Sequence, residues 1–270
     1  MEDYFHVEAF SKVIDPIDWG NYPQKVSENT DRILGLMEKH EVRGTFFVLG
    51  WVAERNKALV QRIASQGHEI ASHGYMHRKI DSMAPTVFRK DIRMSKDILE
   101  NITGSPVIGF RAPTFSITEK TIWALEMLEE EGFRYDSSIF PIRHDRYGYP
   151  SFSRKIIPVR GNLVEIPLST LRVFGNNFPV AGGGYLRLFP LSYNRAGIRW
   201  LNSGEKMPAV LYIHPWELDD KQPKVKVGIF TRFRHYYNLK KTEEKISALL
   251  AEFSWGRICD SIKEYLDGMG

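Results

Sequence analysis

The sequence predicts an α/β fold and, within that class, a β/α barrel. Strand-like and helix-like segments alternate through residues 29–136, a pattern typical of a parallel sheet covered by helices. No G-x-G-x-x-G motif follows a strand, which argues against a dinucleotide-binding sheet. The length of 270 residues suits one barrel domain, since such barrels commonly have roughly 250 residues.

Each helix is expected from apolar residues at helical spacing combined with start or stop signals. Capping residue types open the helix at 29–40, and glycines end the helices at 52–66, 84–102 and 117–131. Later helices are expected at 191–203, 241–253 and 256–267. The expected strands are short apolar runs at 43–49, 68–71, 107–110 and 133–136, one or two strands within 156–168, and one at 209–213.

Domain organisation is expected to be simple. No internal repeat or flexible linker appears, so we expect a single domain over residues 1–270 with a long insertion near 141–190. The first strand is expected to be cut short. Met1 is followed at once by residues typical of a strand end and its loop, whereas a barrel strand usually needs about five residues.

Composition narrows the class of partner. Hydrophobic residues make up 43% of the chain and charged residues 26%, values that suit a globular protein. The net charge of +4 comes from basic residues spread along the chain, so we expect no nucleic-acid partner. The stretch from Lys221 to Lys241 is locally basic. A solvated surface is the favoured interpretation there, with an anionic glycan or a membrane surface as the alternative.

Cellular context is predicted from what the sequence lacks. No apolar run reaches the roughly 20 residues of a membrane-spanning helix, and the N-terminus shows no signal-peptide pattern, so we expect a cytoplasmic protein. Cys259 is the single cysteine, which excludes an intrachain disulfide. The oligomeric state is not predicted by the sequence.

The strongest chemical signal is the segment Ser72-His73-Gly74-Tyr75-Met76-His77, which follows an expected strand. Imidazole is the commonest protein ligand for a cation such as zinc, and a spacing of four puts both rings on one side of a turn. Ordinary surface or core histidines are the alternative. A catalytic metal site needs about three protein ligands, so an Asp or Glu is expected elsewhere.

Further polar residues follow other expected strands. Arg111, Asp136 and His214 each lie directly after one, and Glu2 and Asp3 lie where the first strand should end. A salt bridge, a helix cap or a core histidine would explain each residue singly. Because active sites of β/α barrels lie at the C-terminal ends of the strands, we expect these groups to converge on one site.

The motifs H-G-Y-M-H, G-F-R-A-P, Y-D-S-S and Y-I-H-P-W-E together resemble those of the NodB-homology polysaccharide deacetylases, carbohydrate esterase family 4. The resemblance is greatest to the branch found beside bacterial exopolysaccharide clusters, and it includes residues 182–187. It implies a distorted (β/α)7 barrel and a hydrolase that removes N-acetyl groups from a hexosamine-containing polysaccharide. It also implies a divalent metal, usually Zn²⁺ and sometimes Co²⁺ or Ni²⁺.

The resemblance also implies metal ligands. His73 and His77 would bind the metal with a carboxylate of the first motif. In this branch that motif reads Asp-Val-Glu-Asp, and its first Asp is the general base, which would fall just before residue 1. Strand alternation places Glu2 on the side of that Asp, whereas a turn would make Asp3 the ligand. We favour Asp3 and keep Glu2 as the alternate.

By the same resemblance, His214 would protonate the leaving amine, Arg111 would position the base, and Asp136 would orient and tune His214. The oxyanion needs a further donor, for which we expect a backbone N–H near Thr114. Tyr75, Tyr185 and Trp216 are expected to line the cleft and stack on sugar faces, with core packing as the alternative for each.

Two other functions remain open. The same fold and metal would serve a small-amide or cyclic-ureide hydrolase like the allantoinase-like relatives, which a closed pocket would favour over a wide groove. A glycan-binding protein without the general base is the non-enzymatic alternative.

Overall fold

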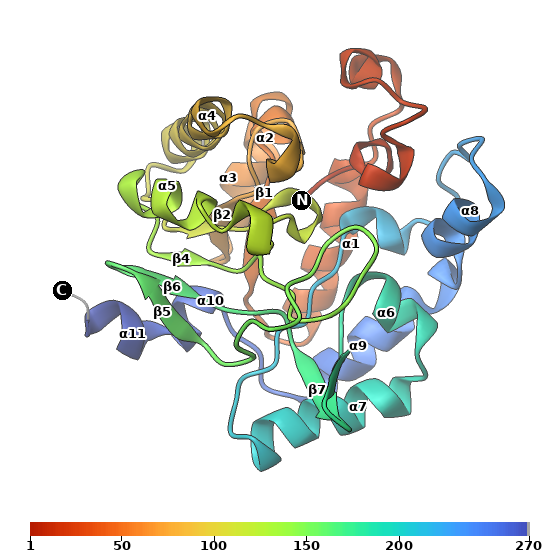
Figure 1. Ribbon diagram of the computed structural model, residues 1–270. Helices are drawn as coiled ribbons and strands as arrows, with labels where there is room; N and C mark the ends of the chain where they lie inside the picture. The colour runs from red at the N-terminus through yellow and green to blue at the C-terminus, as the bar shows by residue number, and fades with distance from the viewer. Residues whose placement is uncertain (269–270) are drawn as a thin grey trace. The chain divides into compact units, whose positions relative to one another are not determined.

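The computed structural model describes residues 1–268 and forms two compact units (Figure 1). Unit 1 comprises Met1–Val42 and Val180–Trp255, and unit 2 comprises Arg43–Pro179 and Gly256–Gly270. The expectation of one catalytic domain over residues 1–270 stays a prediction. None of the described helices is both long and apolar enough to cross a membrane.

Unit 2 contains a six-stranded mixed sheet, which confirms the predicted α/β class. The strand order is β1-β2-β3-β4-β6-β5, parallel throughout except for the antiparallel β5–β6 pair. The strands are β1 (Thr45–Val48), β2 (Glu69–Ser72), β3 (Gly109–Phe110), β4 (Tyr135–Asp136), β5 (Ile157–Arg160) and β6 (Leu163–Glu165).

The register of this sheet aligns the C-terminal ends of its parallel strands. Ser72 at the end of β2 is level with Phe110 at the end of β3. Phe110 is in turn level with Asp136, which pairs with Glu165 at the end of β6. The residues that follow each strand therefore begin at one edge of the sheet, where ligands bind in open α/β sheets.

The helices of unit 2 are α2 (Gly50–Arg55), α3 (Lys57–Ser65), α4 (Pro85–Thr103), α5 (Ala124–Glu130), α10 (Ile258–Ser261) and α11 (Lys263–Asp267). The helix predicted at 52–66 is two helices, because Asn56 leaves the helical conformation (φ −132°, ψ 45°) and its side chain bonds the Val52 carbonyl. α4 ends at Gly104 in the left-handed conformation, as expected. Its Phe88, Ile92 and Leu99 are fully buried, each contributing about 1.5–3 kcal/mol by leaving water.

A hairpin occupies part of the predicted insertion. β7 (Thr170–Val173) pairs antiparallel with β8 (Asn176–Pro179). Phe174 and Gly175 between them both have positive φ, the conformation of tight hairpin turns. The sequence analysis missed this hairpin, because Phe is a poor turn signal.

Unit 1 is helical. Its helices are α1 (Val26–Lys39), α6 (Gly183–Leu188), α7 (Leu191–Arg199), α8 (Ile229–Tyr236) and α9 (Thr242–Glu252), and a π-helical turn follows α7 at Trp200–Gly204. Short 3-10 turns lie at Tyr4–His6, Glu8–Phe10, Pro16–Asn21, Pro215–Leu218 and Leu239–Lys241. α1 packs against the 3-10 turn at Pro215–Leu218.

In unit 1, one expected strand is absent among the described residues and one helix was not predicted. Residues 209–213 form no strand, since they join no ladder and the Tyr212 carbonyl instead accepts a bond from the Gly183 N–H. α8 was not predicted, because its apolar residues lie within the basic stretch that was interpreted as solvated surface.

Candidate functional site

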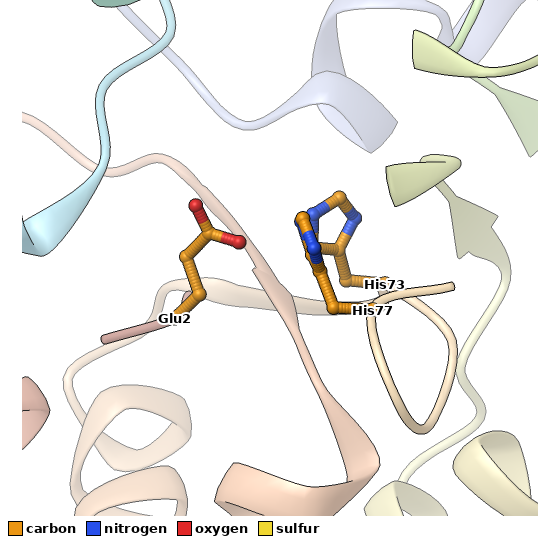
Figure 2. Close-up of side chains that lie close together, drawn as sticks. All are labelled: Glu2, His73 and His77. Carbon is orange, nitrogen blue, oxygen red and sulfur yellow. The ribbon is translucent and has the colours of Figure 1, made fainter. Parts of the chain in front are cut away.

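The loop after β2 carries His73 and His77. The His73 N–H continues the sheet ladder by donating to the Val48 carbonyl. Its ring Nδ1 lies 2.7 Å from the Arg111 carbonyl oxygen, which can only accept, so Nδ1 carries the proton and Nε2 keeps its lone pair. The centroids of the two buried imidazoles lie 5.2 Å apart, and Figure 2 shows both side chains. A histidine that binds a metal through Nε2 commonly donates its Nδ1–H to a carbonyl oxygen, as His73 does here.

Asp91 of α4 fixes the conformation of this loop. Its carboxylate accepts from the Tyr75 N–H at 2.8 Å, and the Gly74 carbonyl accepts from the Gly50 N–H at 2.9 Å. Gly74 has φ +74°, and a Cβ there would lie 2.7 Å from the Asp91 carboxylate. Sequence reasoning missed Asp91, since an acid within an amphipathic helix carries no signal of its own.

Arg111 follows β3 and is buried. Its guanidinium donates to the Ser137 carbonyl and to the Ser137 hydroxyl, both at 2.7 Å, and lies over the Phe47 ring at 4.2 Å. Because its own carbonyl accepts from the His73 Nδ1–H, Arg111 joins the β3 and β4 loops to the histidine loop. The structure brings Arg111, His73 and His77 together at the same edge of the sheet.

Asp136 and Glu165 form a buried carboxyl pair at the ends of β4 and β6. Asp136 accepts from the Ser138 hydroxyl at 2.5 Å, and Glu165 accepts from the Ile139 N–H at 2.9 Å. Burial raises the pKa of both carboxyls. The negative charge of Asp136 raises the pKa of Glu165 further.

His214 in unit 1 is oriented by Glu217. Its Nδ1 lies 3.0 Å from the Glu217 carboxylate, which also accepts from the His214 backbone N–H at 2.9 Å. This capping box opens the 3-10 turn at Pro215–Leu218. Within unit 1, the carboxylate that bonds His214 is thus Glu217, and the predicted role of Asp136 towards His214 stays a prediction. The spacing His-x-x-Glu was readable in the sequence as a capping box and would have identified Glu217.

Arg187 keeps Glu217 ionised. Its Nε lies 2.8 Å from Glu217, and its other nitrogens donate to the carbonyls of residues 234, 235 and 237. Burial opposes ionisation of Glu217, but the Arg187 charge and the bonds from His214 lower its pKa to about 2. For His214, burial is outweighed by the bond to Glu217 and by the charges of Glu217 and Glu2, which raise its pKa.

The two N-terminal carboxylates differ in their surroundings. Asp3 accepts from the backbone N–H groups of Tyr4, Lys25 and Val26, so both of its oxygens cap helical turns. Glu2 accepts from the Trp216 Nε1–H at 3.3 Å and lies 3.8 Å from His214 Nε2. Within unit 1, the carboxylate beside the candidate acid is Glu2, whereas Asp3 is engaged at the start of α1.

The predicted sugar-stacking residues separate into two groups. Trp216 is buried, with His214 and His235 stacked on its ring at centroid distances of 5.4 and 4.2 Å. These contacts favour the core-packing alternative, and the sugar-stacking role stays a prediction. Tyr75 is partly exposed and donates to Glu54, and Tyr185 is partly exposed on α6. Their roles stay predictions, as does that of Thr114, whose φ of 56° lies in the loop after β3.

Glu2, His73 and His77 are a group of described residues that could together hold a metal ion (Figure 2). One carboxylate and two imidazoles are a donor set that suits Zn²⁺ and related cations. On His73 the ring proton is on Nδ1, so metal binding would be through Nε2.

Two family profiles match consecutive parts of the chain. Residues 17–133 match the profile described as polysaccharide deacetylase, and residues 137–263 match a domain of unknown function, DUF3473. The chain is 35% identical over 100 residues to a peptidoglycan-N-acetylglucosamine deacetylase of Bacillus cereus, covering 37% of this chain and 36% of that protein. It is 29% identical over 108 residues to a peptidoglycan deacetylase of Helicobacter pylori, covering 40% and 36%. The matches thus span about a third of each of these relatives.

Solved structures share the fold. A Mycobacterium smegmatis structure, provisionally described as a polysaccharide deacetylase, superposes with a TM-score of 0.61 at 25% identity, covering 96% of this chain and 83% of that one. Puue allantoinase gives a TM-score of 0.57 at 18% identity, covering 89% and 72%, a likeness of fold alone.

Proposed function

We propose, from the match of residues 17–133 to the polysaccharide deacetylase profile and of residues 137–263 to DUF3473, that the chain is a metal-dependent hydrolase that removes N-acetyl groups from a hexosamine-containing polysaccharide. The single observation that carries the proposal is the set of Glu2, His73 and His77, combined with a histidine acid, His214, beside Glu2. We further propose that the protein acts in the biosynthesis or modification of an exopolysaccharide.

The metal, for which we propose zinc, would be held by His73, His77 and Glu2. The fit rests on the donor types and on the Arg111 carbonyl, which accepts from His73 Nδ1 and so places the ring proton on that nitrogen. When bound, such a cation polarises the amide carbonyl and lowers the pKa of water to around 7. Glu2 replaces Asp3 in our assignment, because the Asp3 oxygens accept backbone N–H groups.

His214 would supply the proton that the leaving amine needs. Water adds to the amide carbon, the C–N bond breaks, and the nitrogen takes a proton from Nε2 as acetate leaves. Glu217 fixes the ring by its bond to Nδ1, so that Nε2 is the nitrogen left to donate. The Thr114 backbone N–H would stabilise the oxyanion, and Arg111 would position the base.

Acetate release from N-acetylated glycans tests the function. Two forms are assayed, residues 1–270 and the same chain with Met1 replaced by Asp-Val, because the resemblance places the general base directly before that valine. We expect the extended form to release acetate from a hexosamine polymer, and His214→Ala to abolish release while keeping the metal. Glu217→Gln should lower kcat by about a hundredfold with little change in KM, since it alters only the orientation and charge of the acid.

Glu28→Gln is the matched control, because Glu28 lies in an exposed pair with Lys25. If the protein hydrolysed allantoin-like ureides and released no acetate from any glycan, the proposed polysaccharide substrate would be wrong. Full turnover by Glu217→Gln would remove Glu217 from the mechanism and leave the reaction class standing.

A further inference from the structure

The helix α8 turns its apolar side to solvent. Ile229, Phe230 and Phe233 are 78%, 83% and 52% exposed, and Tyr237 at the helix end is 41% exposed. These positions fall on one side of a helix with 3.6 residues per turn. The opposite side carries His235, which is buried and stacked on Trp216 at 4.2 Å. A surface helix normally packs its apolar side against the core of its own unit, whereas α8 exposes that side.

Positive charge surrounds this stripe. The segment from Lys221 to Lys241 contains seven Lys or Arg residues and no Asp or Glu. Since the whole chain has a net charge of +4, the remaining residues carry −3. All seven cations are exposed, and helical spacing places Arg232 and Arg234 on either side of the stripe. We call the exposed residues of α8 and these seven cations the basic-apolar face.

We propose that the basic-apolar face docks on the surface of an anionic lipid bilayer. Helices that lie in a membrane interface combine exposed apolar side chains with flanking Lys and Arg. Ile229 and Phe230 would enter the headgroup–acyl boundary, while the lysines and arginines would contact lipid phosphates and carboxylates. This association is independent of the proposed hydrolysis.

Two other occupants fit the face less well. A glycan would use hydrogen-bonding side chains and aromatic rings, and Ile229 offers neither, although it is among the most exposed apolar residues. A second copy of the chain would bring seven further cations against the first seven, which like-charge repulsion disfavours. Only an anionic, apolar-cored surface complements both features.

Vesicle co-sedimentation of residues 1–270 tests the proposal. We expect the chain to sediment with vesicles of mixed phosphatidylserine and phosphatidylcholine, to be released by high salt, and to stay in solution with pure phosphatidylcholine. Ile229→Ser combined with Phe230→Ser should weaken partitioning at least about tenfold, because both apolar side chains stay in water. Phe174→Ser is the matched control, since Phe174 is 99% exposed in the β7–β8 turn.

The charges are tested in the same way. Lys224→Gln with Lys226→Gln should weaken partitioning about fivefold per residue, whereas Lys12→Gln with Lys155→Gln, also exposed, should not. Equal binding to both vesicle types, or none, would overturn the proposal. Tighter binding to soluble polygalacturonate, unchanged by the Ile229/Phe230 substitutions, would also overturn it. So would a dimer in sedimentation velocity that dissociates when Ile229 and Phe230 are substituted.

Discussion

At the scale of single residues, neighbouring carboxylates have different physical roles. Asp3 lies at the N-terminus of α1, where its oxygens accept the first backbone N–H groups and its charge faces the positive end of the helix. Burial raises its pKa to about 6 in spite of these bonds. Glu2 faces His214 and Trp216 instead. Adjacent positions in the sequence thus divide into a structural and a candidate metal-binding acid.

Paired substitutions of these two acids separate the roles. We expect Asp3→Ala to lower the free energy of unfolding by about 1–2 kcal/mol and to retain the metal, because only caps are lost. Glu2→Ala should lower metal affinity at least about tenfold with a smaller loss of stability. Denaturant titration and metal analysis after dialysis measure both effects. Metal loss confined to Asp3→Ala would restore Asp3 as the ligand.

At the scale of elements, the loop between β2 and α4 sets the histidine geometry. Its Gly74 has φ +74°, and a methyl group there would meet the Asp91 carboxylate that holds the Tyr75 N–H. The loop depends on α4, the helix that follows it, which also packs against β2.

We expect Gly74→Ala to lower metal affinity at least about tenfold, because the methyl group displaces Asp91 and the loop that carries His73 and His77. Gly104→Ala is the matched control. Gly104 has φ +67° and nothing within 4 Å of a Cβ, so it shares the backbone penalty of about 1 kcal/mol without touching the loop. Equal metal affinity in the two variants, measured by competition with a chelating dye, would show that the loop geometry does not govern binding.

At the scale of the whole molecule, a buried histidine makes stability depend on pH. Burial and the charge of Arg187 lower the pKa of His235 from 6.5 to about 3. Below pH 6.5 the unfolded chain takes up a proton that the folded chain excludes, so stability falls until about pH 3. Asp3 opposes this between about pH 6 and 3.8, and the stabilisation by ionised Glu217 is lost only from 4.5 down to about 2.

The contribution of that imidazole is measured as the difference between the wild type and His235→Gln. With a chelator present, we expect the free energy of unfolding of the wild type to fall by about 3 kcal/mol relative to that of His235→Gln between pH 6.5 and 4.5, since one pKa unit corresponds to about 1.4 kcal/mol. The curve of His40→Gln, the control, should run parallel to that of the wild type. Parallel curves for the wild type and His235→Gln would contradict the assignment.

The sequence by itself determined the α/β class and the ligand types. Periodic apolar runs predicted α1, α4 and α9 closely, because these signals are local. The histidine pair and Arg111 were likewise readable, since they follow strands that the sequence predicted, whereas the strand predicted before His214 does not form. The helices of the region that matches DUF3473 were harder to predict, because α8 carries its apolar residues on the exposed side.

Only the tertiary structure decided which carboxylate serves which histidine. Asp136 is next to a strand end, but its bonds go to Ser138 and its partner is Glu165, while the Arg187 guanidinium holds Glu217 beside His214. Hydrogen bonds and ion pairs of this kind join residues up to 214 positions apart, as between Trp216 and Glu2. Local sequence signals do not predict such contacts, because the course of the backbone in three dimensions, and not the spacing of residues in the sequence, brings these groups within bonding distance.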